Sequence, residues 1–166
     1  YNRFYFVHPD GAVQHYDKKH LFTFGGEHKR FTAGTERVVV NFRGVRILLE
    51  VCYDLRFPVW SRNLGDYDMI LYVASWPTPR VDAWSALLRA RAIENQCYVA
   101  GVNRMGVDPA CEYSGGSAII DPYGKTIAEC PWSRESAVSA DIDMEALQAF
   151  RKKFPVLDDA DPFTLI

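Results

Sequence analysis

Short apolar stretches separated by turn residues recur along the chain of 166 residues, and they predict a series of β-strands. The stretch 69–75 is almost continuously apolar, which is typical of a strand covered on both faces. Turns at 8–11 and 43–44 each separate two such stretches and predict two hairpins. The predicted strands cover residues 4–7, 12–16, 38–42, 45–51, 69–75, 98–102, 117–120, 126–129 and 137–140.

Two other segments show helical spacing. In the segment 81–95 one face of the predicted helix carries Trp84, Leu87, Leu88, Arg91 and Ala92. The segment 143–153 predicts a second helix, with Asp141 or Asp143 as its N-cap. Because apolar strands alternate with helices, we expect a single layered α/β domain over residues 1–166.

The composition narrows the possible partners. The chain is 48% hydrophobic and 14% aromatic, which is ample for a large core. Nineteen basic and 21 acidic residues give a net charge of −2 without a basic tract, so we expect no nucleic-acid partner. No apolar run approaches the roughly 20 residues of a membrane span, and no signal peptide is visible. We therefore expect a cytoplasmic protein without a membrane partner.

The four cysteines do not predict a disulfide framework, because a chain this apolar does not depend on such cross-links. No C-x-x-C or Cys/His spacing indicates a zinc site, so we expect neither a metal nor another cofactor. Cys97 and Cys130 adjoin predicted strands and are expected in or near the core.

Cys52 differs from the other cysteines in its position. It follows the predicted strand 45–51 directly, and the residues after it, 53–58, predict a sharp turn that opens a short helix. The positive end of a helix and its free N–H groups lower the pKa of a thiol and stabilise an oxyanion. The sequence thus favours a nucleophilic cysteine here, although a small buried hydrophobic residue is the alternative.

A possible cationic partner lies upstream, in the segment 16–22. A lysine held near the thiol lowers the pKa of the thiol and can stabilise a tetrahedral oxyanion. Lys18 and Lys19 are both candidates from the pattern alone, and a solvated pair of charges is the alternative.

Five blocks of sequence resemble the carbon–nitrogen hydrolase (nitrilase) superfamily in their order along the chain. They are Tyr16-Asp17-Lys18-Lys19-His20-Leu21-Phe22, then Glu27 with Phe31-Thr32-Ala33-Gly34, then Cys52-Tyr53-Asp54-Leu55-Arg56-Phe57-Pro58, then 102–106, and 115–124. The stretches 52–60 and 159–163 are most similar to the omega-amidase branch, whose members hydrolyse the side-chain amide of 2-oxo acid amides.

The resemblance implies a fold and a set of residue roles. It implies a four-layer α-β-β-α sandwich, with residues 154–166 as a C-terminal tail. By position, Cys52 would be the nucleophile that forms a thioester, and Lys18 the catalytic lysine. Glu27 would be the glutamate oriented towards the lysine and the substrate. The backbone N–H of Tyr53 would form the oxyanion hole together with Lys18. His20 more plausibly orients a loop than acts as a base.

The general-base glutamate of the family would precede Tyr1. We therefore expect that the N-terminal third of the fold is absent from this chain and that the 166 residues alone do not turn over substrate. Glu50, Glu94 and Glu112 are candidates for a base by residue type only, and none lies in the matching block.

A 2-oxo acid amide carries a carboxylate, which an arginine can bind through two hydrogen bonds. Arg56, four residues after Cys52, is the first choice for this contact, and Arg80 is the second. Trp76 is placed to form a wall of the pocket. The alternatives are a salt bridge from Arg56 to Asp54 or Glu94, and ordinary packing for Trp76.

The sequence thus favours a hydrolase of a small carboxylated amide, such as 2-oxoglutaramate, that releases ammonia. Another amidase, an N-carbamoyl hydrolase, or a non-catalytic scaffold that has lost its base are the alternatives. The resemblance also implies a homodimer or a higher homo-oligomer. The residues 58–64, the helix that contains Trp84 and the apolar tail could supply the interface.

Overall fold

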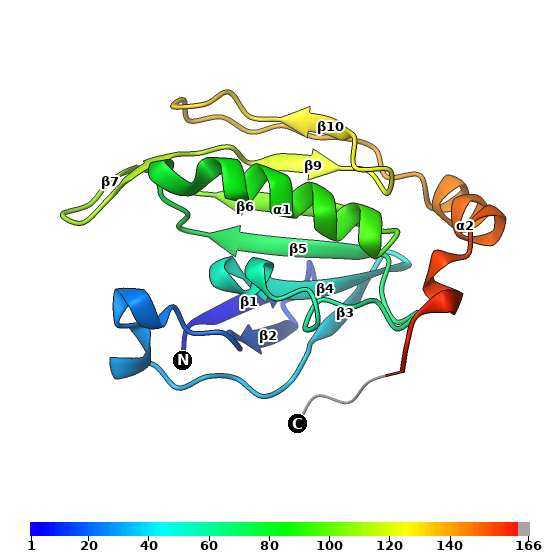
Figure 1. The fold of residues 1–166 in the computed structure, drawn as a ribbon, viewed down its shortest axis with the longest axis horizontal. Helices are drawn as coiled ribbons and strands as arrows, with labels where there is room; N and C mark the ends of the chain where they lie inside the picture. Colours follow the sequence, from blue (N-terminus) through cyan, green and yellow to red (C-terminus); the bar gives the residue numbers. More distant parts are fainter. Residues whose placement is uncertain (163–166) are drawn as a thin grey trace.

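The computed structural model describes residues 1–162. Ten strands and two α-helices, joined by loops and short 3₁₀ turns, make up this part of the chain (Figure 1). They are β1 (Arg3–Val7), β2 (Val13–Asp17), β3 (Val39–Phe42), β4 (Val45–Val51), β5 (Met69–Ala74), α1 (Val81–Glu94), β6 (Tyr98–Asn103), β7 (Met105–Val107), β8 (Glu112–Ser114), β9 (Ala118–Ile120), β10 (Thr126–Glu129) and α2 (Met144–Lys153). The 3₁₀ turns are Thr23–Gly25, Glu27–Lys29, Cys52–Arg56, Thr78–Arg80 and Val156–Asp159.

Six strands form the main sheet, in the order β10-β9-β6-β5-β4-β3. The central strands β4, β5 and β6 are parallel. β3 pairs antiparallel with β4, β9 pairs antiparallel with β6, and β10 pairs antiparallel with β9. Two hairpins, β1–β2 and β7–β8, form small sheets of their own. Because β4 and β5 are parallel neighbours, their C-terminal ends lie at the same edge of the sheet, where Cys52 follows β4.

The main sheet has an apolar cluster on each face, since alternate residues of a strand point to opposite sides. On one face Leu48, Ile70 and Val99 pack with Trp84 and Leu88 of α1. The helix approaches the sheet closely at Gly101, where an added Cβ would lie 2.6 Å from a methyl group of Leu88.

The other face is covered by the β1–β2 hairpin and α2. Phe4, Phe6 and Tyr16 of the hairpin pack there with Leu49 of β4, and α2 contributes Leu147. Asp143 is the N-cap of α2, because its Oδ1 accepts a hydrogen bond of 2.8 Å from the N–H of Ala146. The described residues thus place α1, the main sheet and the hairpin in successive layers (Figure 1).

Most predicted elements agree with the structure to within a residue or two, but the strand predicted at 137–140 is wrong. This segment is extended without a strand partner, and nearly all of residues 131–140 are exposed. Its alternation of Ala, Val and Ser resembles a strand pattern although neither face is buried. The hairpin β7–β8 was not predicted, because its strands of three residues are too short to show a period.

Two further predictions concern the layers and the tail. The α/β class is confirmed, whereas the complete four-layer sandwich stays a prediction. The predicted tail 154–166 reaches beyond the described residues at 163–166. In its described part the carbonyl of Phe154 accepts a hydrogen bond of 2.7 Å from Gln96, while the ring of Phe154 is 59% exposed. No helix in residues 1–162 combines the length and apolar character of a membrane span.

Candidate active site

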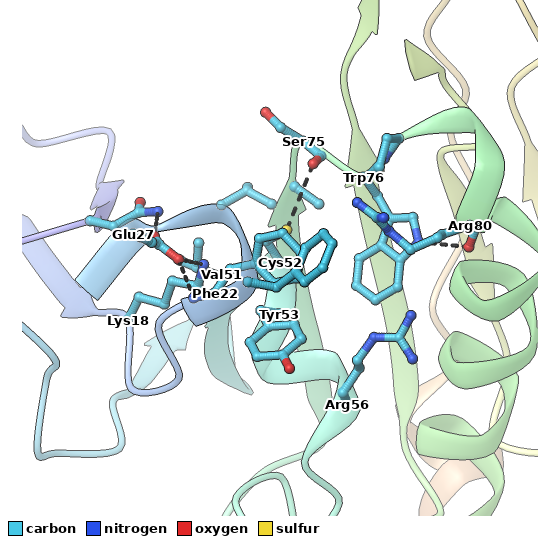
Figure 2. Close-up of a pocket in the computed structure, with 15 residues that line it drawn as sticks. Lys18, Phe22, Glu27, Val51, Cys52, Tyr53, Arg56, Ser75, Trp76 and Arg80 are labelled. Atoms are coloured by element: carbon cyan, nitrogen blue, oxygen red, sulfur yellow. Dashed lines mark hydrogen bonds and ion pairs between the residues drawn. The ribbon is translucent and has the colours of Figure 1, made fainter. Parts of the chain in front are cut away.

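A cavity of about 770 Å³ opens at the C-terminal edge of β4 and β5. All seven residues that were predicted for the site line this cavity, namely Lys18, Glu27, Cys52, Tyr53, Arg56, Trp76 and Arg80. In Figure 2 the side chain of Cys52 lies between two walls, one formed by the Lys18–Glu27 pair and the other by Trp76 and Arg80. Residues from four separate segments therefore meet in one place.

Cys52 is the first residue of a 3₁₀ turn that directly follows β4. Its φ of 50° lies in the left-handed region, which a residue other than glycine adopts only when its surroundings hold it there. Its Sγ lies 3.9 Å from the carbonyl oxygen of Ser75. The N–H of Tyr53 belongs to the first turn, where N–H groups have no acceptor within the helix.

The pKa of the Cys52 thiol differs from the prediction. Burial raises it, and the positive charge of Lys18 only partly opposes that effect, while the charges of Glu27 and Asp54 add to it. The expectation of a lowered pKa is therefore wrong in this structure. The predicted helix is a turn of five residues, and the thiol is largely removed from water.

Lys18 and Glu27 form a nearly buried ion pair, with 2.6 Å between Nζ and Oε2. The side chain of Lys18 is 3% exposed and that of Glu27 13%. Glu27 also accepts hydrogen bonds from the N–H of Phe22, at 2.6 Å, and from the side chain of Asn2, at 2.8 Å. Burial alone would raise the pKa of Glu27, but these three hydrogen bonds lower it, so the carboxylate is ionised at neutral pH.

The backbone around Lys18 is held on both sides. Its N–H donates to the carbonyl of Asn2, and its carbonyl accepts from the N–H of Gly34, each at 2.9 Å. A Cβ added at Gly34 would lie 2.0 Å from the carbonyl oxygen of Asp17, so only glycine fits there. This explains physically why the block that resembles the family ends on Gly34.

Two arginines on the far wall each lie over an aromatic ring. The guanidinium of Arg56 is 4.9 Å from the ring centre of Trp76, and that of Arg80 is 5.5 Å from the ring centre of Phe22. Within residues 1–162 neither arginine forms an ion pair. The alternative of a salt bridge from Arg56 to Asp54 or Glu94 is wrong, because His20 and Arg91 pair with those carboxylates.

Glu27 is the only carboxylate among the described residues that lines the cavity. Glu50 lies fully buried beside Ser61, Glu94 pairs with Arg91, and Glu112 is exposed on β8. None of these three glutamates, which were candidates by residue type, reaches the thiol. In the same part of the chain no three His, Cys, Asp or Glu side chains gather as a metal site requires, and all four cysteines are free thiols.

Comparison with known proteins decides the family. The model of the carbon-nitrogen hydrolase family matches residues 1–152. The chain belongs to this family.

The relatives of this carbon-nitrogen hydrolase include named amidases. It is 55% identical to omega-amidase YafV of Escherichia coli over 99% of the chain and 64% of that protein. It is 41% identical to a 2-oxoglutaramate amidase of Bacillus subtilis over 96% of the chain and 62% of that protein. The chain thus spans less than two thirds of the length of these relatives.

A solved structure agrees with the fold. A CN-hydrolase superfamily protein of Xanthomonas campestris, which carries an arsenic adduct in its active site, superposes with a TM-score of 0.95 at 49% identity. The match covers 99% of this chain and 65% of that protein.

Sequence reasoning missed two asparagines that shape the site. Asn2 holds Glu27, as described above. The side chain of Asn103, at the end of β6, accepts a hydrogen bond of 2.7 Å from the backbone N–H of Trp76 and donates one of 3.0 Å to the carbonyl of Trp76. These two bonds fix the backbone of Trp76 in the cavity wall. Asn103 lies in the block 102–106 that resembles the family, so its place was a signal, whereas Asn2 lies outside all five blocks; nothing local indicated the partners of either residue.

Proposed function

We propose that the protein is an amidase that hydrolyses the terminal amide of a small carboxylated substrate, such as 2-oxoglutaramate, and releases ammonia. One observation carries the proposal: the same cavity is lined by a cysteine, a buried lysine–glutamate pair and two arginines that have no ion-pair partner within residues 1–162. The names of the amidase relatives support this class of substrate.

In the proposed reaction the sulfur of Cys52 attacks the amide carbon and forms an S–C bond, while the thiol proton passes to a base. Glu27 is not assigned as that base, because three donors already hold its two oxygens. The ammonium of Lys18 and the N–H of Tyr53 stabilise the developing oxyanion. Because burial raises the pKa of Cys52 above its ordinary value, the thiol is protonated at neutral pH and its attack needs a base to take the proton.

The intermediate then collapses, the C–N bond breaks, and ammonia leaves after taking up a proton. The product is a thioester on Cys52. Water attacks this thioester, the thiol regains its proton, and the carboxylic acid departs. The arsenic adduct in the active site of the Xanthomonas relative supports a reactive thiol in this cavity, since arsenic is a soft element that favours sulfur.

The far wall is proposed to select the substrate. A guanidinium that lies over an aromatic ring has restricted freedom, so less ordering is needed when it binds a carboxylate. Arg56 and Arg80 are therefore proposed to bind the acid end of the substrate, with Trp76 against its methylene groups.

The test is ammonia release from 2-oxoglutaramate by the complete gene product, beside its Cys52→Ala variant. We expect release from the wild type and none from the variant, and release retained in the variant would exclude Cys52 as the nucleophile. The far wall is tested with Arg56→Gln and Arg80→Gln, against Arg104→Gln as a matched control whose side chain pairs with Asp108 outside the cavity. Loss of a charged hydrogen bond should lower kcat/KM about 10-fold to 100-fold for at least one cavity variant.

The alternatives give different results in the same assay. Release of ammonia from an N-carbamoyl amino acid, but not from 2-oxoglutaramate, would identify an N-carbamoyl hydrolase. No release from any such amide by the folded protein would indicate the scaffold. The predicted homo-oligomer and the cytoplasmic location stay predictions, and light scattering on the complete gene product tests the first.

A further inference from the structure

We propose that Asp54 is a positioning residue that ties the segment carrying Lys18 to the turn carrying Cys52. The proposal deepens the proposed function, because it rests on the catalytic roles given there to Lys18 and Cys52. Asp54 is fully buried and does not line the cavity, so it acts through other residues.

The carboxylate of Asp54 accepts hydrogen bonds from both segments. On the side of Lys18 it accepts hydrogen bonds from the hydroxyl of Tyr16, from the backbone N–H of His20 and from Nδ1 of His20, each at 2.9 Å. From the cysteine side it receives the N–H of Val51 at 3.1 Å. These donors precede and follow Lys18 by two residues and precede Cys52 by one, so a single carboxylate fixes the backbone around both.

The direction of the Tyr16 hydrogen bond is determined by its neighbours. The phenol oxygen already accepts from the indole N–H of Trp60 and from the backbone N–H of Lys19, each at 3.1 Å. Its own proton therefore points to Asp54. Tyr16 donates to Asp54 and accepts from the N–H of Lys19, so it connects Asp54 to the residue next to Lys18.

On the cysteine side the same carboxylate stabilises an unusual backbone. Cys52 lies between Val51, whose N–H donates to Asp54, and Asp54 itself, and its φ of 50° is unfavourable for a side chain. A second contact joins the same two segments, because the imidazole of His20 stacks on the ring of Phe57 at 3.7 Å between centroids. Contacts from the segment that carries Lys18 therefore stabilise the turn that carries the sulfur of Cys52.

The groups that face Asp54 favour a carboxylate. Each of its oxygens accepts from one backbone N–H, that of His20 or that of Val51, so in either orientation an amide would place its own N–H₂ against a backbone donor. Asp54→Asn is therefore a severe change. Tyr16→Phe is a milder one, because it removes one hydroxyl and leaves the backbone donors in place.

The experiment measures how fast iodoacetamide alkylates Cys52 in the folded complete gene product. Mass spectrometry follows the peptide that contains Cys52. The proteins are the wild type, Tyr16→Phe, Lys18→Met and the double variant. Tyr113→Phe is the matched control, since it removes a tyrosine–aspartate hydrogen bond of 2.9 Å outside the cavity.

We expect Tyr16→Phe to slow alkylation of Cys52 about fivefold, because Lys18 then opposes the effect of burial on the thiol less well. In the Lys18→Met background Tyr16→Phe should change the rate less than twofold. Tyr113→Phe should leave it unchanged, and Asp54→Asn, if folded, should slow it at least as much as Tyr16→Phe. For turnover of 2-oxoglutaramate, Tyr16→Phe should lower kcat about 10-fold with little change in KM.

An equal slowing in both backgrounds would overturn the proposal, because Tyr16 would then act independently of the charge of Lys18. An unchanged rate in Tyr16→Phe would overturn it as well. The alkylation assay needs no turnover, so its outcome is separate from that of the proposed function, which is tested by ammonia release from the wild type and from Cys52→Ala.

Discussion

Two fully buried carboxyl groups lie on either side of Cys52, and they differ in the number of donors around them. Asp54 accepts four hydrogen bonds, divided between its two oxygens. Glu50 accepts one, from the hydroxyl of Ser61 at 3.0 Å, and its Oε1 has no partner in the described part of the chain. Asp54 faces the β1–β2 hairpin, whereas Glu50 faces α1.

The two carboxyl groups are equally buried, but they differ in what surrounds them. At Glu50, burial and the neighbouring charge of Asp54 raise the pKa to about 8, so the site favours the neutral acid. At Asp54 the donors replace the water that the carboxylate has lost, and each of them belongs to a segment that must be positioned. A buried carboxylate organises a site only when donors from several segments converge on it.

The largest effect is expected from Asp54→Asn. The amide removes one acceptor oxygen and faces at least one backbone N–H with its own N–H₂, so the free energy of unfolding should fall by about 2–4 kcal/mol. Urea unfolding of the complete gene product at pH 7 measures it. A loss below about 1 kcal/mol would mean that the four donors do not depend on the carboxylate.

Glu50→Gln should have the opposite sign. The pKa of Glu50 is higher in the folded chain than its ordinary value of 4.5, so ionisation opposes folding as the pH rises from about 4.5 to about 8. Glutamine removes this loss, and the variant should be more stable than the wild type by about 1–3 kcal/mol at pH 8. Urea midpoints of both proteins between pH 5 and pH 9 test it.

At pH 5 the difference between the two proteins should nearly vanish, which provides the internal control for Glu50→Gln. Stability curves that run parallel over the whole range would contradict the raised pKa. They would also remove the contrast between the two carboxyl groups.

Replacements of Cys52 test whether the turn held by Asp54 is strained. Glycine accepts a φ of 50° and alanine does not, so Cys52→Gly should be more stable than Cys52→Ala by about 1 kcal/mol. Thermal unfolding of the two variants side by side gives the difference. A less stable glycine variant would show that the turn carries no backbone strain.

The smallest effect is expected at an exposed carboxylate. Asp143 accepts one hydrogen bond of 2.8 Å as the N-cap of α2, and water solvates the rest of it. Asp143→Ala should lower the free energy of unfolding by about 0.5–1 kcal/mol, measured in urea. A loss as large as that of Asp54→Asn would mean that burial is not what separates these carboxylates.

The elements that the sequence predicted best are those whose pattern is local. The strands 45–51 and 126–129 were predicted to the residue, and the helix 81–95 ends one residue earlier at Glu94. The prediction at 137–140 failed because it used only the local pattern. A half-buried strand shows alternation, but it also needs a neighbouring strand to pair with, and that neighbour is not visible in the local sequence.

The sequence predicted those residues of the site that lie in recognisable motifs. The resemblance placed Lys18, Glu27 and Cys52 in one pocket, and they line one cavity. Asp54 was weighed only as a partner of Arg56. Its donors lie up to 38 residues away in the chain, so no local pattern could identify them. The net pKa of Cys52 was missed for the same reason, because burial depends on the whole fold.

The β1–β2 hairpin ends directly before Lys18, and the way it is attached has a consequence for local unfolding. It contributes no strand to the main sheet, and it is attached there by apolar packing and by the donors that converge on Asp54. Such a unit can open while the sheet stays closed. We expect amide hydrogens of β1 and β2 to exchange with deuterium before those of β5 and β6. Each such opening would separate the lysine from the thiol, so the proposed site would come apart transiently long before the chain unfolds.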